Sequence, residues 1–231
     1  MHTGENPRSV SAPTMASHIR RSVIEDLHSG SLVPGMSVDE QSLCERFKTS
    51  RTPVREAMLQ LANEGFLAAG QRSGVVVPKL SVSRLREILE TLAEMEAAAA
   101  KFATRRMTSV LAKELRLAFE RCEAASKSAD ALTYRDANDA FHAVIYKAAH
   151  NELLINQIGM LRTRCAAYTR DRFDSPGRIQ LSLEEHRHLL REIESGDPAR
   201  GHAAMLEHIS IGGRDFAEFV SRLPAQYISS D

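Results

Sequence analysis

The stretch FKTSRTPVREAMLQLANEGFL, residues 47–67, decides how the first part of the chain folds. Three arginines and a lysine lie within residues 46–55, which contain no acid, although the whole chain has 30 Lys+Arg and 30 Asp+Glu. Pro53 fits the first turn of a helix, where its missing N–H costs no hydrogen bond. The stretch therefore predicts a short helix whose first turn carries a local concentration of positive charge.

The residues around this helix predict its neighbours. The apolar residues that follow the proline recur at helical spacing: Val54, Met58, Leu61 and Ala62. Gly65 is a typical helix end. Two earlier helices are expected over residues 16–29 and 39–47, and residues 66–78 predict a hairpin around a polar, glycine-flanked loop. Helix, helix, tight turn, helix and hairpin is the element order of a winged helix-turn-helix.

The charge at the start of the third helix is suited to DNA. A recognition helix enters the major groove by its N-terminal end, and arginine can bind guanine through two hydrogen bonds. The residues that we expect to contact DNA, two of them in the hairpin loop, are Arg46, Arg51, Thr52, Pro53, Arg55, Arg72 and Ser73. The alternative is an ordinary solvated face, which the tight turn, the early proline and the hairpin disfavour.

The hairpin signals stop after Pro78, and six helices are expected in the remainder. Their approximate ranges are 83–106, 109–126, 129–148, 152–171, 178–195 and 198–220. The predicted fold is mainly α, a winged helix-turn-helix followed by an all-helical bundle. The expected divisions are a flexible tail (1–15), the winged domain (16–78), a linker (79–82), the helical domain (83–222) and a C-terminal tail (223–231).

Composition narrows the class of protein. Hydrophobic residues make up 43% of the chain, which is enough for a core, but no apolar run approaches the ~18 residues that cross a membrane. The N-terminus lacks the apolar segment of a signal peptide. The three cysteines, Cys44, Cys122 and Cys165, are far apart in apolar helical patterns, as reduced core residues would be. We expect a cytoplasmic protein with no membrane partner.

Histidines are the informative residues of the second domain. Asn138 and His142 are four residues apart and share one helical face, while His186 and His208 lie in apolar stripes of two other expected helices. Imidazoles that point into a bundle from three helices can share a divalent metal ion, with the amide oxygen of Asn138 as a fourth ligand. The alternative is that each histidine is a separate core residue.

The first domain resembles the DNA-binding domain of GntR-family transcriptional regulators. The resemblance covers about residues 16–78 and rests on SLVPGMSVDEQSLCERFKTSRTPVREAMLQLANEGFL, residues 31–67, with SRTPVREA as its most specific part. It implies that Arg51, Thr52, Pro53 and Arg55 form the operator-contacting segment.

The second domain resembles the FadR-type C-terminal ligand-binding domain, FCD, over about residues 83–220. The resemblance rests on a Phe-His pair, an EEH triplet and a histidine in the last helix. It implies a metal site at Asn138, His142, His186 and His208. Relatives commonly have Asp at the position of Asn138, and often an arginine near that of Leu92.

These observations together predict a regulator rather than an enzyme. We expect a homodimeric repressor that binds a palindromic operator and responds to a small organic acid at the metal, with Tyr146 and Arg162 lining the effector pocket. Zinc is the first choice of metal, and nickel, manganese and iron suit the same ligands. One alternative is a metallohydrolase, for which Glu185 and Glu207 are expected to face away from the site. The other is a sensor of acyl ligands without metal.

Overall fold

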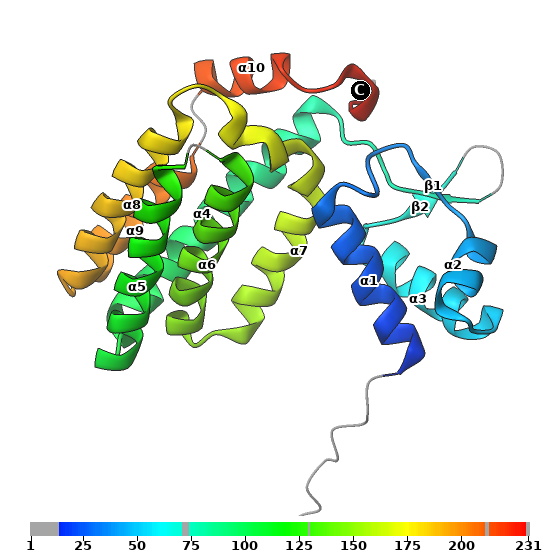
Figure 1. The fold of residues 1–231 in the computed structure, drawn as a ribbon, viewed down its shortest axis with the longest axis horizontal. Coiled ribbons are helices and arrows are strands. Elements are labelled where there is room, and N and C mark those ends of the chain that lie inside the picture. Colours follow the sequence, from blue (N-terminus) through cyan, green and yellow to red (C-terminus); the bar gives the residue numbers. More distant parts are fainter. Residues whose placement is uncertain (1–13, 71–73, 129, 211–212, 230–231) are drawn as a thin grey trace, which may run out of the picture. The chain divides into compact units, whose positions relative to one another are not determined.

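The structure, a computed structural model, describes residues 14–70, 74–128, 130–210 and 213–229. The chain divides into two compact units, Met1–Leu32 with Met36–Pro78, and Val33–Gly35 with Lys79–Asp231. Figure 1 shows the helices and strands of both units. No helix in the described ranges is long and apolar enough to cross a membrane.

The first unit has three helices and a small sheet. Its elements in chain order are α1 (Met15–Ser29), β1 (Ser37–Val38), α2 (Glu40–Phe47), α3 (Arg51–Asn63), β2 (Ala68–Ala69) and β3 (Val75–Val76). The central strand β3 pairs antiparallel with both β1 and β2, so the expected hairpin gains a third strand from before α2. The result is the winged helix-turn-helix that the sequence predicts.

Local signals and a small core fix the helices of this unit. Asp39 accepts a hydrogen bond from the backbone N–H of Ser42 at 2.6 Å and so caps the N-terminal end of α2. Ile19 and Val23 of α1 are fully buried together with Val54 of α3. This core holds the charged first turn of α3 in a defined position on the unit.

The second unit is a bundle of helices. Its elements are α4 (Val82–Arg106), α5 (Ser109–Ser126), α6 (Ala131–Ala149), α7 (Glu152–Thr169), the 3₁₀ helix η1 (Arg170–Asp174), α8 (Arg178–Glu194), α9 (Pro198–Ile209), α10 (Gly213–Ser221) and the 3₁₀ helix η2 (Ala225–Tyr227). The expectation of one continuous last helix over 198–220 is wrong. Ser210 leaves the helix with extended backbone, and two glycines, which are poor helix formers, follow it in the sequence.

Small residues let α4 lie close to its neighbours. Ala97, Ala99 and Ala100 are fully buried, so the alanine run of α4 is a close packing surface. A Cβ on Gly201 of α9 would collide with Thr104 of α4, so the two helices approach closely at that point. The helices that carry the histidines are thereby packed around α4.

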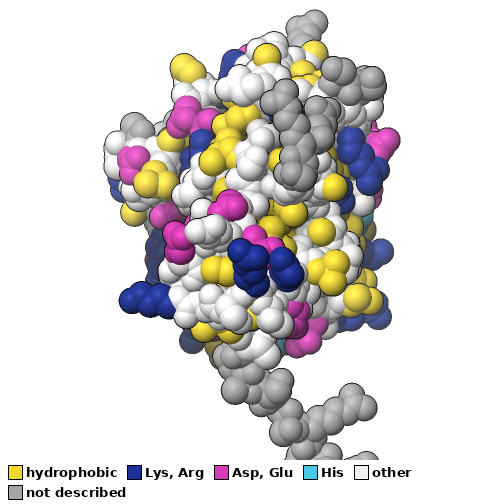
Figure 2. Space-filling model, turned by 90° about the vertical axis from the view of Figure 1, so that its right-hand side faces the viewer, with side chains coloured by type: hydrophobic (Ala, Val, Ile, Leu, Met, Phe, Trp, Pro, Cys, Tyr) yellow, Lys and Arg dark blue, Asp and Glu magenta, His cyan; other side chains and the backbone are white. Residues whose placement is uncertain are grey.

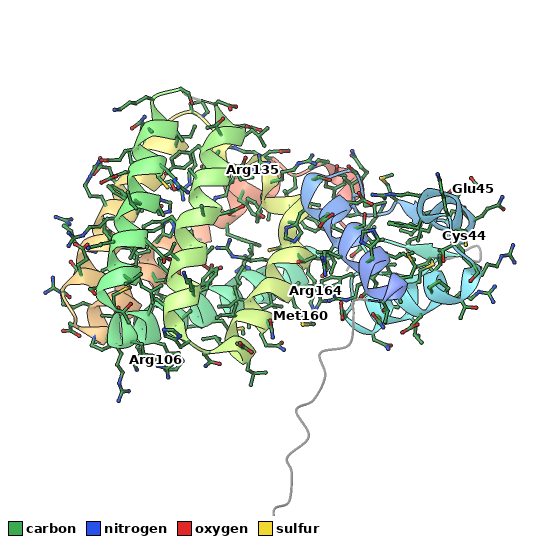
Figure 3. All side chains as sticks on the ribbon, turned by 60° about the horizontal axis from the view of Figure 1, so that its bottom comes forward. Cys44, Glu45, Arg106, Arg135, Met160 and Arg164 are labelled. Atoms are coloured by element: carbon green, nitrogen blue, oxygen red, sulfur yellow. The ribbon has the colours of Figure 1, made fainter. Side chains whose placement is uncertain are left out.

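The carbonyl oxygens at the end of α6 have a hydrogen-bond donor, and two cysteines of the bundle lie in its core. Arg106, labelled in Figure 3 at the end of α4, donates hydrogen bonds to the carbonyl oxygens of Ala149 and His150 at the end of α6. Cys122 and Cys165 are buried free thiols, as expected, whereas Cys44 is a free thiol that is only partly buried. Burial raises the pKa of Cys122 to about 12. Neither buried thiol is a reactive group.

Candidate functional site

Three buried histidines meet inside the bundle. His142 lies on α6, His186 on α8 and His208 on α9, and all three are at most 4% exposed. One ring nitrogen from each lies within 4.8 Å of the corresponding nitrogens of the other two. Asn138, one turn before His142, is also buried. The structure therefore brings together the residues that the sequence selected from three helices.

The ring nitrogens are arranged so that two of them face each other. The Nε2 atoms of His142 and His208 are 3.1 Å apart. Behind the rings, Nδ1 of His208 lies 2.8 Å from a carboxylate oxygen of Glu185, and Nδ1 of His142 lies 3.6 Å from one of Glu96. The carboxylate of Glu185 favours an N–H on Nδ1 of His208, which leaves the lone pair on Nε2. Glu96 is too far from His142 for a hydrogen bond, and Nδ1 of His142 has no partner among the described residues, but the negative charge of Glu96 favours the same tautomer. Two such lone pairs repel each other unless a proton or a cation lies between them.

Each of these carboxylates is held by an arginine. Arg162 donates to the two oxygens of Glu96 at 2.8 and 3.0 Å, and Arg178 donates to those of Glu185 at 3.0 Å each. Burial acts to raise the pKa of Glu185, but hydrogen bonds from His208 and Arg178 hold this pKa below its usual value. The carboxylate of Glu185 is therefore charged and positioned to orient the ring of His208, and the carboxylate of Glu96 lies behind the ring of His142.

The position of Glu185 corrects an expectation from the sequence. We expected it to face away from the site because it precedes His186, and neighbouring residues of a helix point about 100° apart. Its long side chain instead reaches His208 on the adjacent helix α9. The expectation considered only its own helix. Glu207, by contrast, has a largely exposed side chain.

Several polar atoms at the site have no hydrogen-bond partner. Among the residues that the structure describes, both ring nitrogens of His186 are buried without one, and so are Nδ1 of His142, the amide oxygen of Asn138 and the hydroxyl of Tyr146. The amide nitrogen of Asn138 donates to Asp139 at 3.0 Å, which leaves its oxygen as the free atom. Buried polar atoms are normally paired, so these atoms indicate a missing ligand.

The electrostatics suit a metal ion. Burial lowers the pKa of His142 and of His186 well below the ordinary value, and it also lowers the pKa of His208 despite the opposing effect of Glu185. All three rings are thus neutral at pH 7, as metal ligation requires. Nitrogen ligands about 2.1 Å from one ion lie about 3.0 Å apart as octahedral neighbours and about 3.4 Å apart as tetrahedral ones, and the two Nε2 atoms, 3.1 Å apart, lie within this range. The residues present fit a divalent cation.

The sequence did not reveal Glu96, which is completely buried on α4. The available signal was an acid one turn from Leu92 and one turn from Ala100, both on the apolar face of that helix. Leu92 itself is a buried apolar residue. Arg162, which we expected to line the effector pocket, is paired with Glu96, and its guanidinium lies over the ring of Tyr146 at 5.4 Å.

The first turn of α3 is the second candidate site. The side chains of Arg51 and Arg55 are 69% and 64% exposed. Nε of Arg55 lies 2.9 Å from a carboxylate oxygen of Glu40, and Nε of Arg51 lies 3.6 Å from the other. Glu40, at the start of α2, therefore holds both arginines side by side at the N-terminal end of α3. Thr52 between them is exposed.

The other residues that we expected to contact DNA lie in different surroundings from Arg51 and Arg55. Arg46 bonds to Asp26 and Ser22 of α1, so it links two helices of the unit. Pro53 is partly buried in the first turn of α3. Arg72 and Ser73 lie outside the described residues. In Figure 2, lysine and arginine side chains are interspersed with acidic and hydrophobic ones, in keeping with the zero net charge. The exposed cations of α3 are thus a local feature.

Comparison with known proteins agrees with the division of the chain into a winged unit and a helical unit. Residues 15–77 match the gntR family of bacterial regulatory proteins, and residues 87–210 match the FCD domain. The "Probable D-xylose utilization operon transcriptional repressor" of Paenarthrobacter nicotinovorans is 28% identical over 200 residues, which cover 85% of this chain and 86% of that protein. The Nta operon transcriptional regulator of Aminobacter aminovorans is 30% identical over 179 residues, which cover 76% and 82%.

A solved structure has the same fold. The structure of McbR/YncC of E. coli superimposes with a TM-score of 0.75 at 22% sequence identity, over 90% of this chain and 98% of that chain.

Proposed function

Because the chain belongs to the GntR family of bacterial regulatory proteins and carries an FCD domain, we propose that it is a metal-dependent, effector-responsive repressor of the FadR subfamily. It is a DNA-binding transcriptional regulator and not an enzyme. The finer proposal concerns what controls DNA binding: a small organic acid held at a divalent metal site in the helical domain. Repression is proposed because a relative along most of the chain is named a repressor.

One observation carries the metal part of this proposal: three buried, neutral histidines converge on one point, and both nitrogens of His186 are orphaned among the described residues. His142, His186 and His208 would hold the ion, with the amide oxygen of Asn138 as fourth ligand. When bound, a divalent ion supplies positive charge and open positions for carboxylate oxygens. Zinc is the first choice for this ligand set, and nickel, manganese and iron remain alternatives.

The residues around the cluster have supporting roles. Glu185 orients the ring of His208 from behind through a hydrogen bond, Glu96 lies behind the ring of His142, and an arginine holds each carboxylate in place. The hydroxyl of Tyr146 is buried without a partner and can donate to an effector oxygen. Arg162 would act at the pocket through its pairing with Glu96 and its contact with the Tyr146 ring, rather than as a free anion anchor.

We propose that the winged unit binds operator DNA through the first turn of α3. Arg51 and Arg55 are exposed and lie beside the same carboxylate of Glu40, which suits contacts with base edges in the major groove. Thr52 and Pro53 would approach the same groove, and Arg72 and Ser73 of the wing would contact the backbone. Arg46 would support the geometry of α1 and α2. A homodimer in the cytoplasm would place two such units on a palindrome.

Two other functions fit less well. In a metallohydrolase, Glu185 would be the candidate base, but Arg178 and His208 already occupy its carboxylate. A sensor of acyl ligands without metal would leave the nitrogens of His186 and the oxygen of Asn138 buried and unpaired. The orphaned atoms therefore favour the metal-dependent regulator.

Metal titration tests the proposal. Full-length protein stripped with a chelator should bind one equivalent of Zn²⁺ by calorimetry, and His186→Ala should lower the affinity at least tenfold. His188→Ala on the same helix is the matched control, because His188 is partly exposed and lies near Glu192 instead of the cluster. Equal metal binding by the wild type and His186→Ala would mean that the histidines are core residues.

DNA binding supplies the second test. Selection from random duplexes should yield a palindromic sequence, which the metal-loaded protein binds and a panel of organic acids releases. If the selected DNA is released equally by acids in His186→Ala, control does not pass through the metal site.

A further inference from the structure

Arg172 lies in η1, a kinked 3₁₀ segment that packs against α6, α7 and α8. Its guanidinium lies 5.1 Å from the centre of the Phe173 ring, and Phe173 is buried. Phe173 meets Tyr134 edge-on at 5.0 Å, and Tyr134 stacks on His186 at 6.5 Å. A continuous set of ring contacts therefore places the segment that carries Arg172 beside the histidine cluster.

Arg172 differs from Arg162 and Arg178 because it has no acidic side chain as an ion-pair partner among the described residues. Arg162 and Arg178 each bind a glutamate through two hydrogen bonds. Within the described residues, the guanidinium of Arg172 makes no ion pair and no hydrogen bond. The two nearby carboxylates, Glu96 and Glu185, are already occupied. Arg172 is thus a cation without a counterion at the edge of the site.

The charge of Arg172 acts on the site itself. It contributes to the lowered pKa of His142, His186 and His208. Burial, together with repulsion from Arg178 and Arg162, lowers the pKa of Arg172 to about 10, so the group is still cationic at pH 7. Keeping an unpaired charge in dense surroundings costs free energy, and an anion would remove that cost.

A charge count of the site shows what such an anion must balance. The pairs Glu96–Arg162 and Glu185–Arg178 each sum to zero, and the three histidines and Asn138 are neutral ligands. Asp139 is largely exposed and lies 3.6 Å from Arg162. A divalent ion on the histidines would leave its own charge and that of Arg172 as the main uncompensated charges of the pocket.

We propose that Arg172 holds the second anionic group of the effector, and that the effector is therefore a dicarboxylate. One carboxylate is directed to the histidine cluster and the other to the guanidinium of Arg172. Arginine suits this role because its planar donors match a carboxylate bidentately. This inference rests on the proposed metal-dependent function and adds the chemical class of its effector.

Matched acids test the inference on the metal-loaded, full-length protein. Calorimetry compares oxalate, malonate, succinate and glutarate with the monocarboxylates of the same chain length, acetate, propionate, butyrate and valerate. At least one dicarboxylate should bind at least tenfold more tightly than its monocarboxylate. Arg172→Gln should weaken that dicarboxylate about 10- to 100-fold and leave the monocarboxylates within about threefold. Arg172→Lys should restore part of the difference.

The matched control is Arg191→Gln, which removes the same charge from an exposed position on α8. It should leave the affinity of every acid unchanged. Arg172→Gln should keep metal affinity equal or higher, and the metal-free variant should melt at the same or a higher temperature, because it loses an uncompensated charge. A clear fall in melting temperature would mean that Arg172 is structural and would overturn the inference.

Two other results would also overturn it. One is a panel in which no dicarboxylate exceeds its monocarboxylate, and the other is an unchanged preference in Arg172→Gln. If the wild type binds no metal in the parallel titration, the proposed metal site itself is wrong. If metal binds normally and the acids show no charge preference, only the role of Arg172 fails.

Discussion

At the scale of single residues, the histidine cluster depends on what lies behind each ring. Glu185 and Glu96 face the Nδ1 atoms of His208 and His142, so the Nε2 atoms of the two rings point at each other. His186 has no partner for either nitrogen. The cluster is therefore neutral, buried and incomplete in the chain alone, and two predictions follow from these three properties.

The first prediction concerns pH. The pKa of His186 is far below that of a histidine in an unfolded chain, about 6.5. Below that pH the unfolded chain binds a proton that the folded chain does not, so the free energy of unfolding falls as pH drops through 6.5 and is level above it. In metal-free protein, His186→Gln should reduce this slope by up to about 1.4 kcal/mol per pH unit.

Urea unfolding at pH 7.5, 6.5 and 5.5 measures the slope. His188→Gln is the control, because its side chain is 42% exposed. Identical slopes in the wild type and both variants would show that His186 is protonated in the folded protein.

The second prediction concerns Asn138, whose amide oxygen is buried and unpaired. Asn138→Asp should raise metal affinity on the order of tenfold, about 1.4 kcal/mol, because a carboxylate adds charge. The same change should destabilise the metal-free protein, because it buries an unpaired carboxylate. Calorimetry and melting curves measure the two effects, with Asp136→Asn, at an exposed position on the same helix, as the control. A variant that binds metal no better than the wild type would exclude residue 138 as a ligand.

At the scale of elements, α3 and α7 each position side chains that interact with other parts of the molecule or with a partner. Helix α3 presents Arg51 and Arg55, which Glu40 of α2 holds side by side. Helix α7 carries Tyr168, whose hydroxyl accepts a hydrogen bond from the N–H of Leu80 at 2.9 Å and donates to the carbonyl oxygen of Tyr227 at 3.0 Å. The first arrangement concerns recognition, and the second fastens the segment after Pro78 to the end of the chain.

For α3, we predict that Arg51→Ala weakens operator binding by about 1–3 kcal/mol if it reads a base, with little loss on nonspecific DNA. Arg46→Ala should instead act on stability, by at most about 1 kcal/mol, because Arg46 is bonded to α1 and is about half exposed. Fluorescence anisotropy on specific and random duplexes separates the two. An equal loss on both duplexes would make Arg51 a phosphate contact, and no loss on either would remove α3 from the interface.

For α7, we predict that Tyr168→Phe destabilises the protein by about 1–3 kcal/mol, because it leaves a backbone donor and a carbonyl without their shared partner. The contact is reinforced by Ser229, whose N–H donates to the carbonyl oxygen of Leu80 at 3.1 Å. Urea unfolding measures the change. Tyr227→Phe is the matched control, since Tyr227 takes part through its backbone oxygen and not its hydroxyl. Similar stabilities for both variants would make the bridge unimportant.

At the scale of the whole molecule, we predict that two copies of the chain form a symmetric dimer on a palindromic operator. A dimer that reads both halves of a palindrome needs its two recognition helices about one turn of DNA apart, roughly 34 Å or 10 base pairs. The full chain, of 25.6 kDa, should sediment at twice that mass. Inserting five base pairs between half-sites turns one half-site to the opposite face and should abolish tight binding, while ten restore part of it. Equal binding to all three spacings would indicate that each chain binds independently.

The sequence alone determined the features that depend on local chemistry. The proline in the first turn of α3, the cap at Asp39 and the glycine-flanked loop specify a winged helix-turn-helix, because each acts within a few residues. The spacing of Asn138 and His142 set them on one face of α6, since helical periodicity is also local. The histidines were therefore identifiable as candidate ligands before their convergence was seen.

Only the tertiary structure decided which partner each charged group has. Glu185 reaches the histidine of another helix, Glu96 is held by an arginine 66 residues away, and Arg46 turns back to α1. Arg172 lies near the same acids and makes no ion pair with any residue that the structure describes. Such pairings depend on how helices pack, and a long side chain can reach several neighbours, so periodicity along one helix does not determine them. The residues that would hold metal could be read from the sequence, whereas the charge balance that points to the effector could not.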